Sequence, residues 1–315
     1  MSAEEENERI SSYTKRNTGL AKAQNFVKYR ARQVIAKCIS VVRVGPEKVY
    51  LIPRIARGGN WLYEWMKAHA ERQETGNDVY VVQMPGMDVW LEEFPLLKDF
   101  TLDAQKIRFR SLRETGMHQR IREQFTEEQI QRFIQEVLLS SESFQQKIAH
   151  AQKYVGEDTL VINVRRGDYY SHPHIHKNFG IDTVAYLHEA TQQMLKVHTP
   201  SNILVTSDDT QWCAENLGFL KDIAPTQFEK IGYGMFGDFA ALSVSRYLIL
   251  TNTTFGYWGA YIATVRQKAQ VWAPNVHELE QSLRQIHSQP PFQHQQSWIS
   301  VAPTDGYRSW LESER

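Results

Sequence analysis

Two arginines, Arg165 and Arg166, stand directly after a short apolar run at residues 159–164. The alternation of side chains in this run predicts a buried strand, so the arginines emerge at its carboxyl end, where open α/β sheets bind ligands. A guanidinium keeps its charge at any relevant pH and presents a planar fork of N–H donors that can bind phosphate bidentately. Asp168 follows closely enough to hold one fork in place. The pattern predicts a phosphate site, with a surface salt bridge at a strand end as the alternative.

Polar side chains also follow two other predicted strands. Ser207 and Asp208 come after a strand at 203–206, and the sequence Thr-Asn-Thr-Thr at 251–254 separates a strand at 247–250 from a helix. Hydroxyls and backbone N–H groups at a helix N-terminus form an anion site, although the same residue types also serve as ordinary helix caps. Because three strand ends of one sheet carry the same polar chemistry, we favour a shared anion site.

The elements that position these residues alternate between strand and helix, which predicts parallel sheets with helices on both faces. Helical patterns occur at 60–70, at 210–217 and after a capping box formed by Thr126 and Gln129. A chain of 315 residues exceeds one ordinary core, so we expect an α/β protein with two Rossmann-like domains. The strand patterns lie at residues 49–52, 79–83, 160–164, 203–206, 247–250 and 269–272.

The first part of the chain has a different character from the rest. It begins acidic and polar, and residues 21–40 then show a basic amphipathic helix pattern. Such a helix can lie on a membrane surface, but we favour packing against the body of the protein. We expect an N-terminal extension at 1–45, a first domain at 46–152 and a second domain at 153–315.

Charge and cysteine content exclude several classes of protein. The 36 basic and 36 acidic residues give a net charge of zero, so no global field attracts nucleic acid and any anion site is local. Cys38 and Cys213 match no metal spacing and suit a reducing compartment. The sequence shows no signal-peptide pattern and no apolar run long enough to span a bilayer. We therefore expect a cytoplasmic protein without a nucleic-acid partner, which contacts a membrane only peripherally, through residues 21–40.

Three blocks of the sequence resemble the α-1,2-fucosyltransferases. Residues 163–169, Asn-Val-Arg-Arg-Gly-Asp-Tyr, resemble their His-x-Arg-Arg-Gly-Asp-Tyr motif, and residues 205–212 resemble their Ser-Asp-Asp-x-x-Trp motif. Residues 252–261 resemble their Asn-Ser-Thr-Phe-Ser-Trp-Trp-Gly-Ala-Tyr block, in the same order and at the same spacing. The resemblance runs from about residue 57 to 272 and is specific mainly in the second half. It implies two Rossmann-like domains facing a cleft (GT-B type), GDP-β-L-fucose as donor, and inverting transfer to a sugar hydroxyl without a metal.

The resemblance also implies roles for individual residues. Arg165 would grip the β-phosphate of GDP, supported by Arg166 and Asp168, and would act catalytically by stabilising the charge on the departing diphosphate. Asp238, expected just before a helix at 239–245, would accept from the guanine N1–H and amino group, with simple helix capping as its alternative. The remaining donor-binding residues implied in this way are Asn163, Ser207, Asp208, Asn252, Thr253, Thr254 and Phe255.

The chain departs from the family pattern at several positions. Asn163 replaces the family histidine, Gly256 and Tyr257 replace serine and tryptophan, and Arg-Gly-Gly at 57–59 replaces glycine-leucine-glycine. These departures affect the expected identity of the acceptor more than that of the donor, because the residues expected to bind phosphate are kept. The sequence does not single out a general base for the acceptor proton. The candidates lie in the first domain: Glu64, His69 and Asp88.

Two weaker patterns compete with this interpretation. Residues 232–237 fit G-x-G-x-x-G, the pattern of a nicotinamide dinucleotide site. However, the preceding residues 228–231 form a poor strand, and no acidic residue follows about 20 positions later to bind the ribose. His172, His174 and His176 are expected on a mobile, solvated loop rather than in a metal site.

The favoured function is transfer of fucose in α-1,2 linkage to a terminal galactose of an oligosaccharide or glycolipid. The alternatives are a related fucosyltransferase with another linkage or a protein acceptor, and a nucleotide-sugar-binding protein without turnover.

Overall fold

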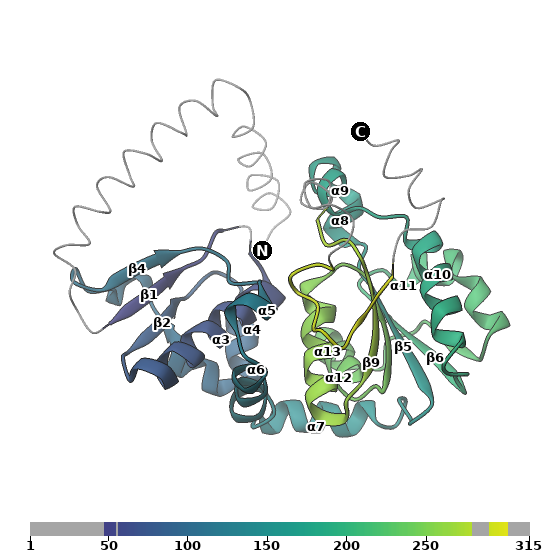
Figure 1. The fold of residues 1–315 in the computed structure, drawn as a ribbon, viewed down its shortest axis with the longest axis horizontal. Coiled ribbons are helices and arrows are strands. Elements are labelled where there is room, and N and C mark those ends of the chain that lie inside the picture. Colours follow the sequence, from purple (N-terminus) through teal and green to yellow (C-terminus); the bar gives the residue numbers. More distant parts are fainter. Residues whose placement is uncertain (1–46, 55, 279–289, 302–315) are drawn as a thin grey trace. The chain divides into compact units, whose positions relative to one another are not determined.

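The computed structural model describes residues 47–54, 56–278 and 290–301, and the chain divides into two compact units after His118 (Figure 1). Each unit contains its own parallel sheet. The predicted extension at residues 1–45, with its basic helix at 21–40, lies outside the described residues. Within the described ranges, no helix is long and apolar enough to cross a membrane.

The first unit has a four-stranded parallel sheet in the order β3-β2-β1-β4. Its long helix, α3 (Gly58–Thr75), connects β1 to β2 and ends where Gly76 takes up the left-handed conformation that favours glycine. The helix buries Trp65 and Met66 completely. The other elements are β1 (Lys48–Leu51), β2 (Val79–Val82), α4 (Asp88–Glu93), η1 (Pro95–Phe100), β3 (Thr101–Leu102), η2 (Ala104–Lys106) and β4 (Leu112–Thr115).

The second unit has a six-stranded parallel sheet in the order β10-β9-β8-β5-β6-β7. The register places Asn163 of β5 opposite Thr206 of β6 and Leu250 of β8, so these three strands end level with one another. The residues that follow them are therefore brought to one edge of the sheet. The strands are β5 (Thr159–Val164), β6 (Asn202–Ser207), β7 (Thr226–Gln227), β8 (Tyr247–Leu250), β9 (Gln270–Pro274) and β10 (Ile299–Val301).

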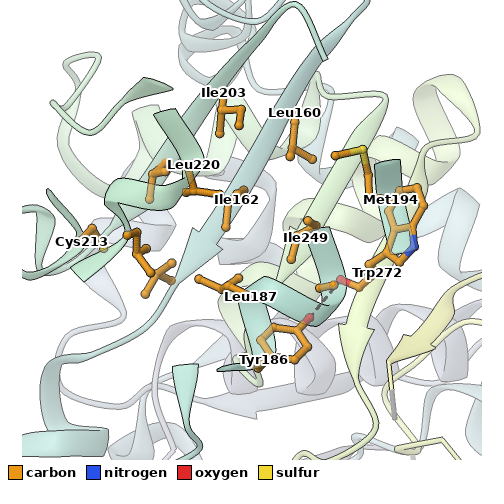
Figure 2. Close-up of a cluster of buried hydrophobic side chains, with 14 of the residues drawn as sticks. Leu160, Ile162, Tyr186, Leu187, Met194, Ile203, Cys213, Leu220, Ile249 and Trp272 are labelled. Atoms are coloured by element: carbon orange, nitrogen blue, oxygen red, sulfur yellow. Dashed lines mark hydrogen bonds between the residues drawn. The ribbon is translucent and has the colours of Figure 1, made fainter. Parts of the chain in front are cut away.

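Helices cover both faces of this second sheet (Figure 1). On one face, alternate strand residues such as Leu160 and Ile162 pack with α10 (Thr183–Leu195) and α11 (Thr210–Asn216) in a buried cluster (Figure 2). On the other face, α12 (Gly234–Ser243) contacts β5 and β6, and α13 (Thr254–Gln267) contacts β8. The sheet is thus doubly wound, as the sequence predicts.

The boundary between the units lies at His118, not at the predicted residue 152. The intervening helices belong to the second unit because their aromatic side chains pack on its helices. Phe133 contacts Trp258 of α13, and Phe144 contacts Phe239 of α12. These intervening elements are α5 (Ile121–Gln124), α6 (Glu127–Phe133), the π-helical turn η3 (Ile134–Leu138) and α7 (Glu142–Ala151).

Most predicted elements are confirmed, including the six predicted strands and the capping box of Thr126 and Gln129. The loop predicted around the histidines is wrong. Residues there form two short helices, α8 (Gly167–Ser171) and α9 (Pro173–Phe179). The proline that suggested a loop occupies the first position of α9, where its missing N–H and fixed φ are tolerated. A further short helix, η4 (Gly218–Asp222), follows α11.

The close packing of α13 on α12 depends on Gly259. A Cβ at this position would lie 2.5 Å from the Leu242 Cβ, closer than side-chain carbons approach one another. We expect Gly259→Ala to lower the free energy of unfolding by about 1–2 kcal/mol in a denaturant titration, because the overpacking cost exceeds the gain in helix propensity. Gly218→Ala is the control, since nothing lies within 4 Å of its added Cβ. Wild-type stability of Gly259→Ala would contradict this packing.

Candidate functional site

Arg165 is held at the carboxyl end of β5 by three contacts. Its backbone N–H donates to the Thr251 hydroxyl at 3.0 Å, its guanidinium donates to Asp168 at 2.6 Å, and the same guanidinium lies 2.9 Å from the Asp208 carboxylate. The side chain remains 34% exposed. A guanidinium has five N–H donors, so these two carboxylate contacts leave donors for a ligand. The predicted meeting of the three strand ends is confirmed.

The two neighbouring carboxylates of the Ser-Asp-Asp sequence have separate tasks. Asp208 accepts from the Arg166 backbone N–H at 2.8 Å with one oxygen and pairs with Arg165 through the other. Asp209 caps α11 by accepting from the Trp212 N–H. Ser207 is buried, and its hydroxyl accepts from the Asp209 N–H. Capping therefore explains Asp209 but not Asp208, which connects β6 to both arginines.

The Arg166 guanidinium lies between two aromatic rings. Its Cζ is 3.5 Å from the Tyr170 ring centroid and 3.8 Å from that of Trp212, distances at which a cation is attracted to an aromatic face. Both rings therefore contact the guanidinium, and its Nε is buried without a hydrogen-bond partner in the structure. The predicted phosphate contact of Arg166 stays a prediction, and the stacking adds a positioning role that the sequence analysis missed. The tryptophan of the Ser-Asp-Asp-x-x-Trp pattern was the available signal.

The turn before α13 combines a structural and a ligand-facing part. The buried Asn252 side chain donates to the backbone carbonyls of Phe179 and His277, at 2.8 and 2.9 Å. Thr253 caps α13 by accepting from the Phe255 N–H, and Thr254 is the first helical residue. The first N–H groups of a helix lack intrahelical partners, so this end of α13 provides donors and a positive dipole end next to Arg165. Phe255 packs against Phe239 at a ring separation of 5.1 Å.

Asn163 and Gly256, two of the departures from the family pattern, lie against each other. The buried Asn163 side chain donates to the Thr206 hydroxyl at 3.1 Å, and its Oδ1 has no hydrogen-bond partner in the structure. A Cβ at Gly256 would lie 2.6 Å from that oxygen. The two substitutions are therefore coupled in space, since a side chain at 256 requires Asn163 to move.

Asp238 lies inside a helix, so its predicted place before a helix at 239–245 is wrong. Helix α12 starts at Gly234, because three consecutive residues with positive φ, Gly232, Tyr233 and Gly234, turn the chain directly into it. Capping is thus not the role of Asp238. Its carboxylate instead accepts from the ammonium of Lys230, which also donates to the Ser207 carbonyl. Lys230 stands in no recognisable motif, so its contact with Asp238 could not be predicted from the sequence.

Charge and burial act against each other across this edge. Burial lowers the pKa of Arg165, but the charges of Asp208 and Asp168 outweigh it and hold that pKa above its usual value. Burial raises the pKa of Asp238, and the opposing effect of Lys230 does not cancel it. The site thus alternates positive and negative groups, so it presents directed N–H donors rather than an excess of positive charge.

The three candidate bases of the first unit have different surroundings. Glu64 is fully buried in α3, and both of its carboxylate oxygens contact His118. One oxygen accepts from the His118 backbone N–H at 2.6 Å, and the other lies 2.8 Å from the His118 Nδ1. His69 is buried beside Phe100, with ring centroids 5.5 Å apart. Asp88 is exposed at the start of α4 and accepts from Gln83. Their role as base stays a prediction.

The remaining patterns have structural explanations. At Gly237 an added Cβ would lie 1.9 Å from the Gly232 carbonyl oxygen, so the glycines of residues 232–237 let a loop close on its own helix. Cys213 is buried, and burial raises the pKa of its thiol to about 11. Across the described parts of the chain, no group of three or more His, Cys, Asp or Glu side chains is arranged to hold a metal ion.

Comparison with known proteins gives three results. The profile of the family described as Glycosyl transferase family 11 matches residues 88–296, more than half of the chain. Galactoside alpha-(1,2)-fucosyltransferase 1 of Bos taurus is 34% identical over 106 residues, which are 32% of this chain and 28% of that protein. The O-antigen biosynthesis glycosyltransferase WbnK of Escherichia coli is 27% identical over 114 residues, 36% of this chain and 37% of that protein. The matches thus span only about a third of the relatives' lengths.

Two solved structures have a similar trace over about three quarters of the chain. An Arabidopsis thaliana FUT1 mutant in complex with GDP has a TM-score of 0.47 and 11% identity, and covers 76% of this chain and 74% of that chain. POFUT1 in complex with GDP-fucose has a TM-score of 0.34 and 9% identity, and covers 75% of each chain.

The pairing of His118 with Glu64 predicts a pH-dependent stability. Burial lowers the pKa of His118, but hydrogen bonds and charge from Glu64 and Glu114 outweigh it and raise that pKa above its ordinary 6.5. The stabilisation is therefore complete below pH 6.5 and lost as pH rises through the raised pKa. The pKa of Glu114 is lowered from 4.5, so the stabilisation that Glu114 contributes is lost as pH falls through the lowered pKa. We expect His118→Asn to destabilise by about 1–3 kcal/mol between these limits, with a smaller loss above the raised pKa.

The measurement is denaturant unfolding of both proteins across this pH range. Glu114→Gln serves as the matched variant, since removing one carboxylate should shift the loss of stabilisation to lower pH. If the free energies of unfolding of wild type and His118→Asn differ by the same amount at every pH, the charged pairing is contradicted.

Proposed function

The chain belongs to glycosyl transferase family 11, and on that premise we propose that it transfers L-fucose from GDP-β-L-fucose to a sugar hydroxyl. The favoured product is an α-1,2 link to a terminal galactose of an oligosaccharide or glycolipid, formed with inversion at the anomeric carbon. The names of the bovine and bacterial relatives support a glycan acceptor.

The observation that carries this proposal is the position of the Arg165 guanidinium. Arg165 lies at the carboxyl end of β5, and Asp168 and Asp208 fix its guanidinium. Its backbone N–H donates a hydrogen bond to Thr251, in the turn before α13. As the bond from fucose to the diphosphate breaks, negative charge develops on the departing phosphate oxygens. Donors that are already oriented toward those oxygens stabilise this charge without reorganising. Arg165 and the first N–H groups of α13 are such donors.

Recognition of the base is assigned to Asp238. An ionised carboxylate accepts from both the N1–H and the amino group of guanine, whereas uracil lacks this pair of donors. Asp238 is buried, so a base that leaves its oxygens unsatisfied binds poorly. The position of Asp238 in α12, near the charge of Asp208, supports a base site on the same edge as Arg165.

The acceptor side is less constrained by the described residues. Asn163 and Gly256 differ together from the family pattern and lie against each other beneath the start of α13. A related fucosyltransferase with another linkage or a protein acceptor, or a nucleotide-sugar-binding protein without turnover, therefore stays as an alternative. Glycan analysis of the product separates the first two from the favoured function, and absence of GDP release with diverse acceptors identifies the third. A cytoplasmic location and membrane contact through residues 21–40 also stay predictions.

Arg165→Lys tests the phosphate assignment, because lysine keeps the charge but loses the planar fork. We expect turnover with GDP-fucose to fall on the order of a hundredfold, the typical loss for one donor at a developing oxyanion. The thermal unfolding midpoint should stay close to that of wild type. Arg246→Lys, at a half-exposed arginine before β8, is the control and should keep full turnover. Near-native turnover of Arg165→Lys would show that another group binds the diphosphate.

Metal removal tests the proposed metal-independent transfer. Two arginines and a helix N-terminus can offset the diphosphate charge, so we expect turnover to be unchanged after exhaustive treatment with EDTA. The measurement is the initial rate of GDP release before and after treatment, with manganese and magnesium added back separately. Loss of turnover that either ion restores would require a metal in the mechanism.

A further inference from the structure

Lys230 connects the end of a strand to the proposed base-binding carboxylate. It lies in the segment between β7 and α12, and its ammonium donates both to the carbonyl oxygen of Ser207, the last residue of β6, and to Oδ2 of Asp238. The Lys230 side chain is 42% exposed, whereas that of Asp238 is only 9% exposed. Lys230 thus covers one side of a carboxylate that is otherwise enclosed by protein.

Lys230 favours the charged form of Asp238. Burial is the largest influence on its pKa and raises it, the negative charge of Asp208 raises it further, and Lys230 acts in the opposite direction. The other charged groups at elements packed on α12 have different partners. From α7, Lys147 lies over the Tyr233 ring and His150 contacts the Ile231 carbonyl, and from the end of β5, Arg165 pairs with Asp208. Lys230 is therefore the cation that acts on Asp238.

The charge state of Asp238 decides what it can bind. An ionised carboxylate has acceptor sites on both oxygens, enough for one lysine and for two donors of a purine edge. A protonated carboxyl presents an O–H on one oxygen, which opposes one of the two guanine donors. A neighbouring cation that lowers the Asp238 pKa therefore favours guanine recognition.

We propose that Lys230 is the positioning residue of the nucleotide site: it fixes the Asp238 carboxylate against the β6 carbonyl and keeps it in the ionised form that guanine selects. This inference rests on the proposed use of a guanine nucleotide. It adds a second residue to base selectivity, one that need not touch the base itself.

The test is calorimetric titration of the full chain with GDP and with UDP between pH 6 and 8.5. Lys230→Met should weaken GDP binding roughly tenfold at pH 7, the effect expected when a charged hydrogen-bond acceptor is lost. Binding should recover as pH rises, because burial and Asp208 raise the Asp238 pKa and the variant has no lysine to oppose them. Lys230→Arg should keep the GDP affinity of wild type and the same weak dependence of that affinity on pH. Lys221→Met is the control for loss of a partly exposed lysine that lies near an aromatic ring, and should bind GDP as wild type does.

Asp238→Asn makes the experiment a double-mutant cycle. Once Asp238 is replaced, Lys230→Met should have no further effect on GDP affinity and should show no pH dependence. If Lys230→Met does not fold, Lys230→Gln gives the same comparison, because glutamine can donate to the Ser207 carbonyl without charge.

The outcomes separate the two proposals. Wild type that prefers GDP over UDP, together with a Lys230→Met variant of unchanged affinity or of reduced affinity independent of pH, would overturn the role of Lys230 and leave the proposed function standing. Wild type that shows no preference for GDP would overturn both.

Discussion

The charged contact of Arg165 with Asp168 and Asp208 is the interaction on which the rest of the site depends. Asp168 comes from α8, Asp208 from the end of β6, and the Arg165 backbone is bonded to Thr251 at the end of β8. One residue, through its backbone and its side chain, thus connects the ends of three adjacent strands. The register of these parallel strands makes them end nearly level, so the sheet presents the residues that follow them at a single edge.

The same edge illustrates how a buried polar site avoids excess charge. Each cation that the described residues place there has a carboxylate or an aromatic face beside it: Arg165 has two aspartates, Arg166 two rings and Lys230 one aspartate. Such pairing fixes the orientation of long side chains before a ligand arrives. Under the proposed function, the directions of these donors and acceptors, rather than a positive net charge, select the anionic ligand.

The sequence predicted the strands and the meeting of their ends because apolar runs followed by polar residues report directly on parallel sheets. It failed where local signals were ambiguous. Asp238 was expected at a helix start, but the glycines at 232 and 234 allow the helix to begin earlier without a capping side chain. Residues 121–151 were assigned to the first domain, because only tertiary contacts such as Phe144 with Phe239 show where those helices pack. Lys230 belongs to no pattern, since its role arises from a contact across the fold.

We propose that Arg165 binds the terminal phosphate of the nucleotide diphosphate. Calorimetry with GDP and GMP tests this role in wild type and in Arg165→Lys, because the two ligands differ only in the β-phosphate. Wild type should bind GDP at least about tenfold more tightly than GMP, as expected for a charged, bidentate contact, and Arg165→Lys should lose most of this difference while it keeps its GMP affinity. An equal ratio of GDP to GMP affinity in the two proteins would contradict it.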